Sequence, residues 1–171
     1  MLPDIAISPG VSAGKKTAMR SPHAGSGSKI FAELEGDTGN LSILAPQSRP
    51  IVWLATQRHA PEGSLVILFS TRPNRLDPAD RDEIQRQLTE ILPQARIRAI
   101  AATDWAADPF SKGSWCALQP GRTREVVPAL ARPEGRIHFA SADTAQGWRG
   151  FVDGAIESGL RAAREIGETL R

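Results

Sequence analysis

Only one cysteine, Cys116, and no tyrosine occur among the 171 residues. A single thiol excludes an internal disulfide framework and a zinc site made of several thiolates. There is no run of five like charges, and 21 Lys and Arg nearly balance 19 Asp and Glu, so the charge pattern does not predict nucleic-acid binding. No stretch approaches the roughly 18 apolar residues of a membrane span, and the first residues lack the order of a signal peptide. We therefore expect a cytoplasmic protein without a membrane contact.

Nucleotide-binding and metal-binding motifs are also missing. Residues 10–17 resemble a phosphate-binding loop but have one residue too few between the glycines, and no GxGxxG follows a predicted strand. The histidines His23, His59 and His138 are scattered and have no carboxylate at metal-ligand spacing, so no metal site is expected. For Cys116, a packed structural role is favoured over that of a nucleophile.

Apolar alternation in the first hundred residues predicts antiparallel strands. Ile30, Ala32 and Leu34 would share one face of a strand over 29–34. Further strands are predicted at 41–45, 51–55, 65–69 and 97–101. Two helices are expected, one at 13–19 capped by Ser12 and one that starts at Asp77 and Pro78 and stops before Pro93.

The remainder of the chain is predicted to be irregular until its end. Residues 105–133, rich in Pro, Gly and Ser, predict loops with no long regular element. A short strand at 137–140 should then lead through a turn into a long amphipathic helix from about 150 to 170. Its inner face is expected to consist of Ile156, Leu160, Ala163 and Ile166. The predicted fold class is α+β, with antiparallel strands, a flanking helix and a C-terminal strand–turn–long helix.

Aromatic residues concentrate in this C-terminal region. Six of the nine Trp and Phe residues (four Trp plus five Phe) lie at or beyond position 105. The start of a long helix presents unpaired N–H groups and about half a positive charge, which would stabilise negative charge on a reduced isoalloxazine. A planar ligand would explain the aromatics and the small residues at 154–159, but an apolar core and tight helix packing explain them as well.

Two segments carry a resemblance to a known family. Residues 137–144 read Ile-His-Phe-Ala-Ser-Ala-Asp-Thr, and residues 148–155 read Trp-Arg-Gly-Phe-Val-Asp-Gly-Ala. This closely resembles the C-terminal signature of the FAD-dependent amine oxidases, the monoamine oxidase and polyamine oxidase superfamily. Residues 108–115 and 119–121 also resemble the family segment that precedes the signature. The resemblance covers almost the whole chain, but only the C-terminal half of the family's length.

The resemblance implies a set of cofactor-binding positions. Ser114, Ala142, Asp143 and Thr144 would lie against FAD, and Val152 would offer its backbone N–H to the pyrimidine carbonyl of the flavin. Ser114 stands where covalent members carry the flavin-linking cysteine, and Cys116 comes two residues later. Non-covalent FAD is therefore expected.

The resemblance also implies substrate-binding and catalytic positions. Trp115 and Phe151 occupy the positions of two aromatic rings that flank the substrate amine. Lys29 sits where the family carries a catalytic lysine that holds a water beside flavin N5. A solvated lysine at a strand end is the alternative for Lys29.

The implied domains are parts of a larger fold. Residues 1–105 would belong to the substrate-binding domain and 106–171 to the C-terminal segment of the FAD-binding domain, while the N-terminal GxGxxG half of the family is absent. The expected function is oxidation of a small-molecule amine to an imine, together with a complementary N-terminal FAD-binding chain or as a homo-oligomer. The alternative is a non-catalytic remnant or protein-binding module.

Overall fold

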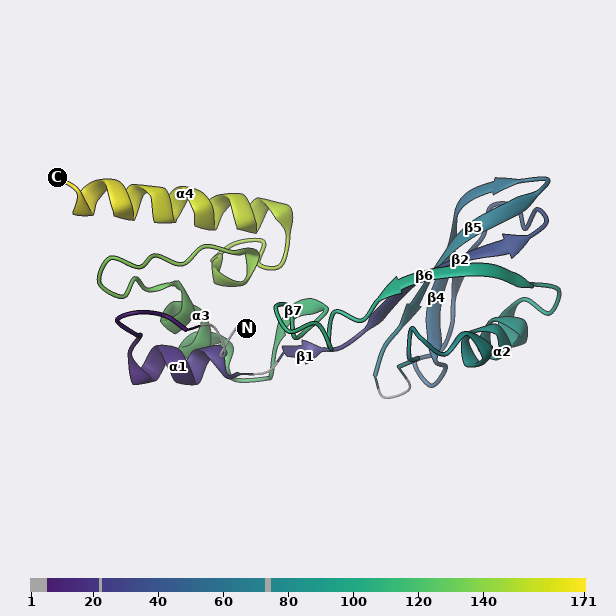
Figure 1. Ribbon diagram of the computed structural model, residues 1–171, viewed down its shortest axis with the longest axis horizontal. Coiled ribbons are helices and arrows are strands. Elements are labelled where there is room, and N and C mark those ends of the chain that lie inside the picture. Colours follow the sequence, from purple (N-terminus) through teal and green to yellow (C-terminus); the bar gives the residue numbers. More distant parts are fainter. Residues whose placement is uncertain (1–5, 22, 73–74) are drawn as a thin grey trace. The chain divides into compact units, whose positions relative to one another are not determined.

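The computed structural model describes residues 6–21, 23–72 and 75–171. The chain forms two compact units, one of Met1–Gly25 with Pro109–Arg171 and one of Ser26–Asp108 (Figure 1). Both contain helices and antiparallel strands, so the predicted α+β class is confirmed. Among the described residues, no helix is long and apolar enough to cross a membrane. The functional domains 1–105 and 106–171 remain predictions.

The unit Ser26–Asp108 is a five-stranded antiparallel sheet with one helix. Its elements are β2 (Ser28–Glu35), β3 (Ser42–Leu44), β4 (Ile51–Ala60), β5 (Gly63–Ser70), α2 (Arg81–Ile91) and β6 (Ile97–Thr103). The strand order is β3-β4-β5-β2-β6, so β3, β4 and β5 form a meander and β2 lies between β5 and β6. All five strands predicted in this region are present.

One face of this sheet forms the core. Ile30, Ala32 and Leu34 are fully buried, as their alternation predicts, and Ile84 and Leu88 of α2 pack in the same cluster. Burial of each large aliphatic side chain contributes about 1.5–3 kcal/mol.

The start of α2 differs from the prediction. The helix begins at Arg81 because the Asp80 side chain, and not that of Asp77, accepts the hydrogen bond from the first turn, from Glu83 N–H at 3.0 Å. Asp77 instead accepts from Ala79 N–H at 2.9 Å and closes the turn before the helix.

The other unit is built around small helices and a strand pair. Its elements are α1 (Ala13–Met19), β1 (His23–Gly25), β7 (Trp115–Leu118), α3 (Thr123–Ala131), the 3₁₀ turn η1 (Ala142–Thr144) and α4 (Val152–Thr169). β1 and β7 pair antiparallel. Ser12 caps α1 as predicted, accepting from Lys15 N–H at 3.2 Å. Ala18, Val126 and Leu130 form a small core between α1 and α3.

Two predictions for this unit are wrong. Residues 105–133 contain the regular elements β7 and α3. α3 forms because Val126 and Leu130, four residues apart, are buried in one core with Ala18 of α1, and Pro128 is tolerated in the last turn of α3. The strand predicted at 137–140 does not form. Only an isolated bridge between Glu134 and Ile137 is present there, and the carbonyl of Phe139 bonds to an arginine side chain instead of a strand.

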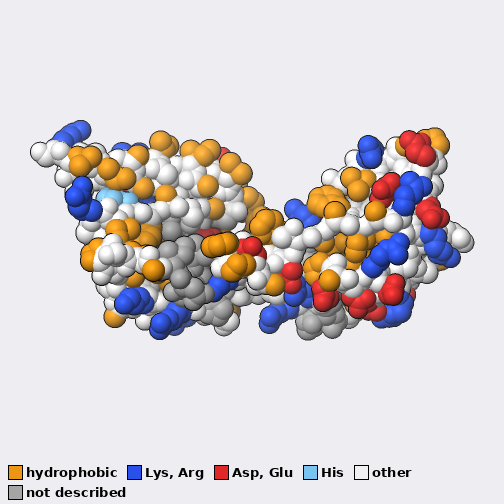
Figure 2. Space-filling view, viewed as in Figure 1, with side chains coloured by type: hydrophobic (Ala, Val, Ile, Leu, Met, Phe, Trp, Pro, Cys, Tyr) orange, Lys and Arg blue, Asp and Glu red, His pale blue; other side chains and the backbone are white. Residues whose placement is uncertain are grey.

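The long helix α4 has the predicted extent but the opposite orientation. Its buried residues are Gly154, Ser158 and Ala162, whereas Ile156, Leu160 and Ile166 are 58%, 57% and 42% exposed and Ala163 is exposed as well. The small residues let the helix approach the preceding turn: a Cβ on Gly154 would lie 2.4 Å from the carbonyl oxygen of Trp148. Figure 2 shows hydrophobic side chains along the outer side of α4. We call Val152, Ile156, Leu160, Ile166 and Leu170, all largely exposed, the outer stripe of α4.

Stability measurements can check this orientation. Ser158→Leu should cost about 1–3 kcal/mol because it overpacks a fully buried position. Leu160→Ser should change the free energy of unfolding by less than about 0.5 kcal/mol because Leu160 is exposed. Urea titration followed by circular dichroism measures both. The reverse order of effects would contradict the observed orientation.

Candidate functional site

A cleft of about 290 Å³ opens between β7, η1 and the loops around them. The residues that line it include Ser114, Trp115, Cys116, Ala142, Asp143 and Gly150. The structure thus brings four of the predicted site residues together, although 28 positions separate Ser114 from Ala142 (142 − 114). The strand pair and the 3₁₀ turn supply the two walls.

Side-chain hydrogen bonds of Ser141 and Thr144 fix the 3₁₀ turn. The Ser141 hydroxyl accepts from Asp143 N–H at 3.1 Å, and the Thr144 hydroxyl accepts from Ser141 N–H at 3.1 Å and donates to Ser141 C=O at 3.0 Å. This reciprocal arrangement is a capping box. Because its hydroxyl is used inside the turn and its side chain is buried, Thr144 can serve a ligand only through its backbone.

Three titratable side chains meet on one side of the cleft. His23 Nε2 lies 3.7 Å from Asp143 Oδ2, and a Cβ on Gly113 would overlap the His23 ring at 2.6 Å. Burial lowers the pKa of His23 even though the Asp143 carboxylate opposes this shift. Burial, reinforced by a hydrogen bond to Asp143, raises the pKa of Cys116 to about 12. The thiol is therefore a protonated hydrogen-bond donor, and it lines the cleft at intermediate burial.

The predicted aromatic pair is also in contact. Trp115 and Phe151 are 55% and 46% exposed, and their ring centroids lie 5.4 Å apart at an interplanar angle of 84°. Trp148 extends the group, 5.9 Å from Phe151 at 88°. These edge-to-face contacts leave large parts of each ring open to a ligand. From the sequence, Trp148 belongs to the family signature but has no predicted role in the site. Its φ of 44° is uncommon for a bulky residue.

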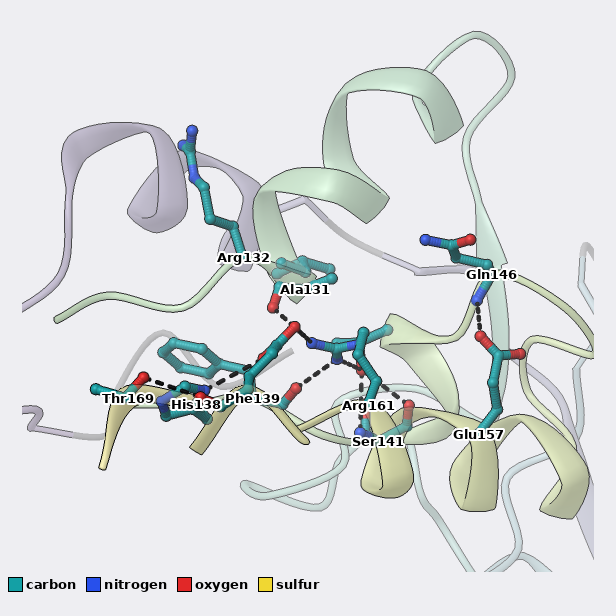
Figure 3. A network of polar contacts seen from close by, with 12 residues as sticks. Ala131, Arg132, His138, Phe139, Ser141, Gln146, Glu157, Arg161 and Thr169 are labelled. Carbon is teal, nitrogen blue, oxygen red and sulfur yellow. Dashed lines mark hydrogen bonds and ion pairs between the residues drawn. The ribbon is translucent and has the colours of Figure 1, made fainter. Parts of the chain in front are cut away.

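The N-terminus of α4 lies beside this aromatic group. Its N-cap residue, Phe151, makes no side-chain capping hydrogen bond, and Val152, the first helical residue, is largely exposed. The Glu157 carboxylate accepts from the backbone N–H groups of Gln146 and Gly147 at 3.0 and 2.9 Å (Figure 3). The preceding loop thus obtains an acceptor from α4. The first turn of the helix has no side-chain cap, although Asp153 in that turn offsets part of its positive potential.

Lys29 lies on the face of the sheet opposite to the core. It is exposed on β2, and its Nζ lies 5.3 Å from the ring centroid of Phe69, its register partner on β5. Phe69 in turn contacts Trp53 of β4, with ring centroids 5.0 Å apart. Sequence reasoning missed Phe69 and Trp53 because no local pattern encodes the pairing of β2 with β5 and of β5 with β4.

The residues around the cleft suit a flavin. The uncapped start of α4, the rigid backbone of η1 and the half-exposed rings of Trp115 and Phe151 supply donors, positive potential and apolar surface for a planar group that gains negative charge.

Comparison with known proteins gives the same class. The profile of the family described as "Flavin containing amine oxidoreductase" matches residues 2–167, and the chain belongs to this family. Pseudooxynicotine dehydrogenase of Pseudomonas sp is 36% identical over 171 residues, which is 98% of this chain and 34% of that protein. Nicotine dehydrogenase of Pseudomonas putida is 34% identical over 97% of this chain and 34% of its own length. The chain therefore spans about a third of the length of these relatives.

Solved structures share the fold. Wild-type putrescine oxidase bound to putrescine superimposes with a TM-score of 0.76 at 19% identity, over 98% of this chain and 41% of that chain.

The alkylation rate of Cys116 depends on the charge of Asp143, because this carboxylate raises the pKa of the thiol. With a pKa of about 12, Cys116 should react slowly with iodoacetamide near about pH 8. Its rate should continue to rise at pH values where an ordinary thiol is already fully ionised. Asp143→Asn removes the negative charge, lowers the pKa of Cys116 and should speed alkylation at least about threefold near about pH 8. Mass spectrometry of timed samples measures the rate, with Asp153→Asn as the control. Equal rates in both variants would show that Asp143 does not act on the thiol.

Proposed function

We propose that this chain provides the C-terminal part of a flavin-dependent amine oxidoreductase that oxidises an amine to an imine. FAD would be bound without a covalent link, and the rest of the family fold would be supplied by further polypeptide, in the same chain, in a separate chain or in a second copy. The observation that carries the proposal is the cleft in which Ser114, Ala142 and Asp143 meet. A cytoplasmic location remains a prediction.

The cofactor positions follow from the cleft and from α4. Bound FAD would supply the two-electron acceptor for the amine. The backbone of Ala142, Asp143 and Thr144 and the N–H of Val152 would hold and orient it, and the positive end of α4 would favour negative charge on the reduced ring. Ser114 has no sulfur for a thioether, and the Cys116 thiol is held protonated by burial and Asp143, which supports non-covalent binding.

Each of the two units offers one aromatic surface of its own. Trp115 and Phe151 offer partly exposed rings. Apolar surroundings would favour the neutral amine, whose lone pair is needed for oxidation, and a ring face can also hold the cationic form. In the unit Ser26–Asp108, Phe69 and Trp53 lie beside Lys29, which the family resemblance makes the proposed catalytic residue that would hold a water at the flavin.

These aromatic surfaces favour an amine with an apolar or aromatic body. The names of two relatives, nicotine dehydrogenase and pseudooxynicotine dehydrogenase, support the same class of amine.

The need for further polypeptide is supported by the outer stripe of α4. Five large apolar side chains along one helix face are exposed by 42% to 76%, a pattern typical of a surface that another element covers. The relatives are about three times as long as this chain, so the family fold has ample material to cover it.

A flavin titration tests the cofactor site. The chain, alone and with a candidate N-terminal half, should quench flavin fluorescence in a saturable way. Phe151→Ala and Asp143→Ala should each weaken binding roughly tenfold, equivalent to about 1.4 kcal/mol. Arg164→Ala removes an exposed side chain of α4 that does not line the cleft and should leave the affinity unchanged. Absence of binding under both conditions would contradict the proposal.

Anaerobic reduction of the bound flavin tests the chemistry. Addition of an apolar amine should bleach the visible absorbance of the oxidised flavin. Lys29→Met should slow this bleaching at least about tenfold while the flavin affinity stays constant, because a group that acts on the reacting centre changes the rate and not the binding of the cofactor. A normal rate in Lys29→Met would remove Lys29 from the reaction.

A further inference from the structure

The segment 138–144, which contains η1 and part of the cleft, is not held by a sheet. The predicted strand over 137–140 is missing, and a single bridge between Glu134 and Ile137 is the nearest ladder contact in the described chain. Its backbone must therefore obtain hydrogen bonds from elsewhere, because buried carbonyl groups without partners are costly.

Arg161 of α4 provides these bonds. Its Nη2 donates to Phe139 C=O at 2.7 Å and reaches the Thr144 hydroxyl at 3.5 Å, while Nη1 donates to Ala131 C=O at 3.2 Å. Figure 3 shows the guanidinium between these acceptors. The side chain is only 18% exposed. One planar fork thus joins α4, the end of α3 and both sides of η1, a geometry that a lysine cannot reproduce.

Glu165, one turn further along α4, completes the arrangement. It accepts from Arg161 Nη1 at 2.9 Å, and its other oxygen lies 3.2 Å from His138 Nδ1. Burial acts to raise the pKa of Glu165, but the hydrogen bonds from Arg161 and His138 outweigh it and lower the pKa. Residues 138 and 139 are therefore both held by an ion pair on one face of α4.

The end of α3 is fixed by cations as well. Lys15 is fully buried, donates from Nζ to Leu130 C=O at 2.8 Å and to Arg132 C=O, and lies 3.7 Å from the Phe139 ring centroid. Lys15 and Arg161 thus neutralise the partial negative charge at the C-terminus of α3 from two sides. The anchor against which Arg161 holds the segment is itself rigid.

We propose that Arg161 is a positioning residue for the flavin site: acting through Phe139 and Thr144, it fixes the turn 141–144, in which Ala142 and Asp143 line the cleft. This inference rests on the proposed function, since it assigns a purpose to the turn. Lys15 secures α3 and Phe139, whereas Arg161 bonds both the end of α3 and the turn.

Amide hydrogen exchange measured by NMR on the full chain tests the local effect. In Arg161→Met the amides of Thr144 and Gly150, which donate to Ser141 C=O and Ala142 C=O, should exchange at least about tenfold faster. The amide of Val126, buried in α3 of the same unit, should change by less than about twofold. Arg164→Met removes an exposed arginine from the same helix and should leave all three rates unchanged.

Arg161→Lys keeps the charge and loses the fork, so its exchange rates should lie between those of the wild type and Arg161→Met. If Arg161→Met does not fold, Arg161→Lys is compared with the wild type instead, and the amides of Thr144 and Gly150 should exchange at least about threefold faster in this variant. Equal acceleration at Val126 would show a general structural role and overturn the inference. Unchanged rates at Thr144 and Gly150 would overturn it as well.

Flavin titration links the turn to the cofactor. Arg161→Met should raise the FAD dissociation constant at least about tenfold. Ser141→Ala should also raise this constant, but by a smaller factor in the Arg161→Met background than in the wild type, because both changes loosen the same turn. Additive effects, with flavin still bound, would overturn the role of Arg161 and leave the proposed function intact. A wild-type chain that binds no flavin, with or without a complementary half, overturns the proposed function and the role of Arg161 together.

Discussion

The close approach of α4 to the turn that precedes it is the constraint on which the C-terminal unit depends. A Cβ on Gly154 would lie 2.4 Å from the carbonyl oxygen of Trp148, so only glycine permits this contact. Ser158 and Ala162 are the other small residues on the same buried face of α4. This contact brings Arg161 within reach of α3 and of Phe139. The same contact leaves the N-terminus of α4 beside the aromatic group, where a cofactor can use it.

Local patterns predicted much of the fold. The alternation of Ile30, Ala32 and Leu34 and the Ser12 cap were readable because each is decided within a few residues. The orientation of α4 was not readable, since an apolar stripe indicates a contact surface without saying which element covers it. Here the small residues face the turn and the apolar stripe faces outward.

The site was partly predictable for a different reason. The signature around Asp143 and Phe151 is a continuous pattern, so a resemblance could locate it, and the structure brings Ser114, Ala142 and Asp143 to one cleft. Phe69 and Trp53 could not be found in this way, because only the register between β2, β5 and β4 places them beside Lys29. Arg161 escaped notice because its acceptors are backbone carbonyls, which carry no sequence signal.

The outer stripe of α4 has a thermodynamic consequence for the chain when nothing covers it. Two copies could bury their stripes against each other, so the apparent midpoint of unfolding would rise with protein concentration even though no intramolecular contact changes. Such association would be driven by apolar area, would weaken on cooling and would strengthen in sulfate. The apparent free energy of unfolding then depends on protein concentration, temperature and salt as well as on the contacts within one chain.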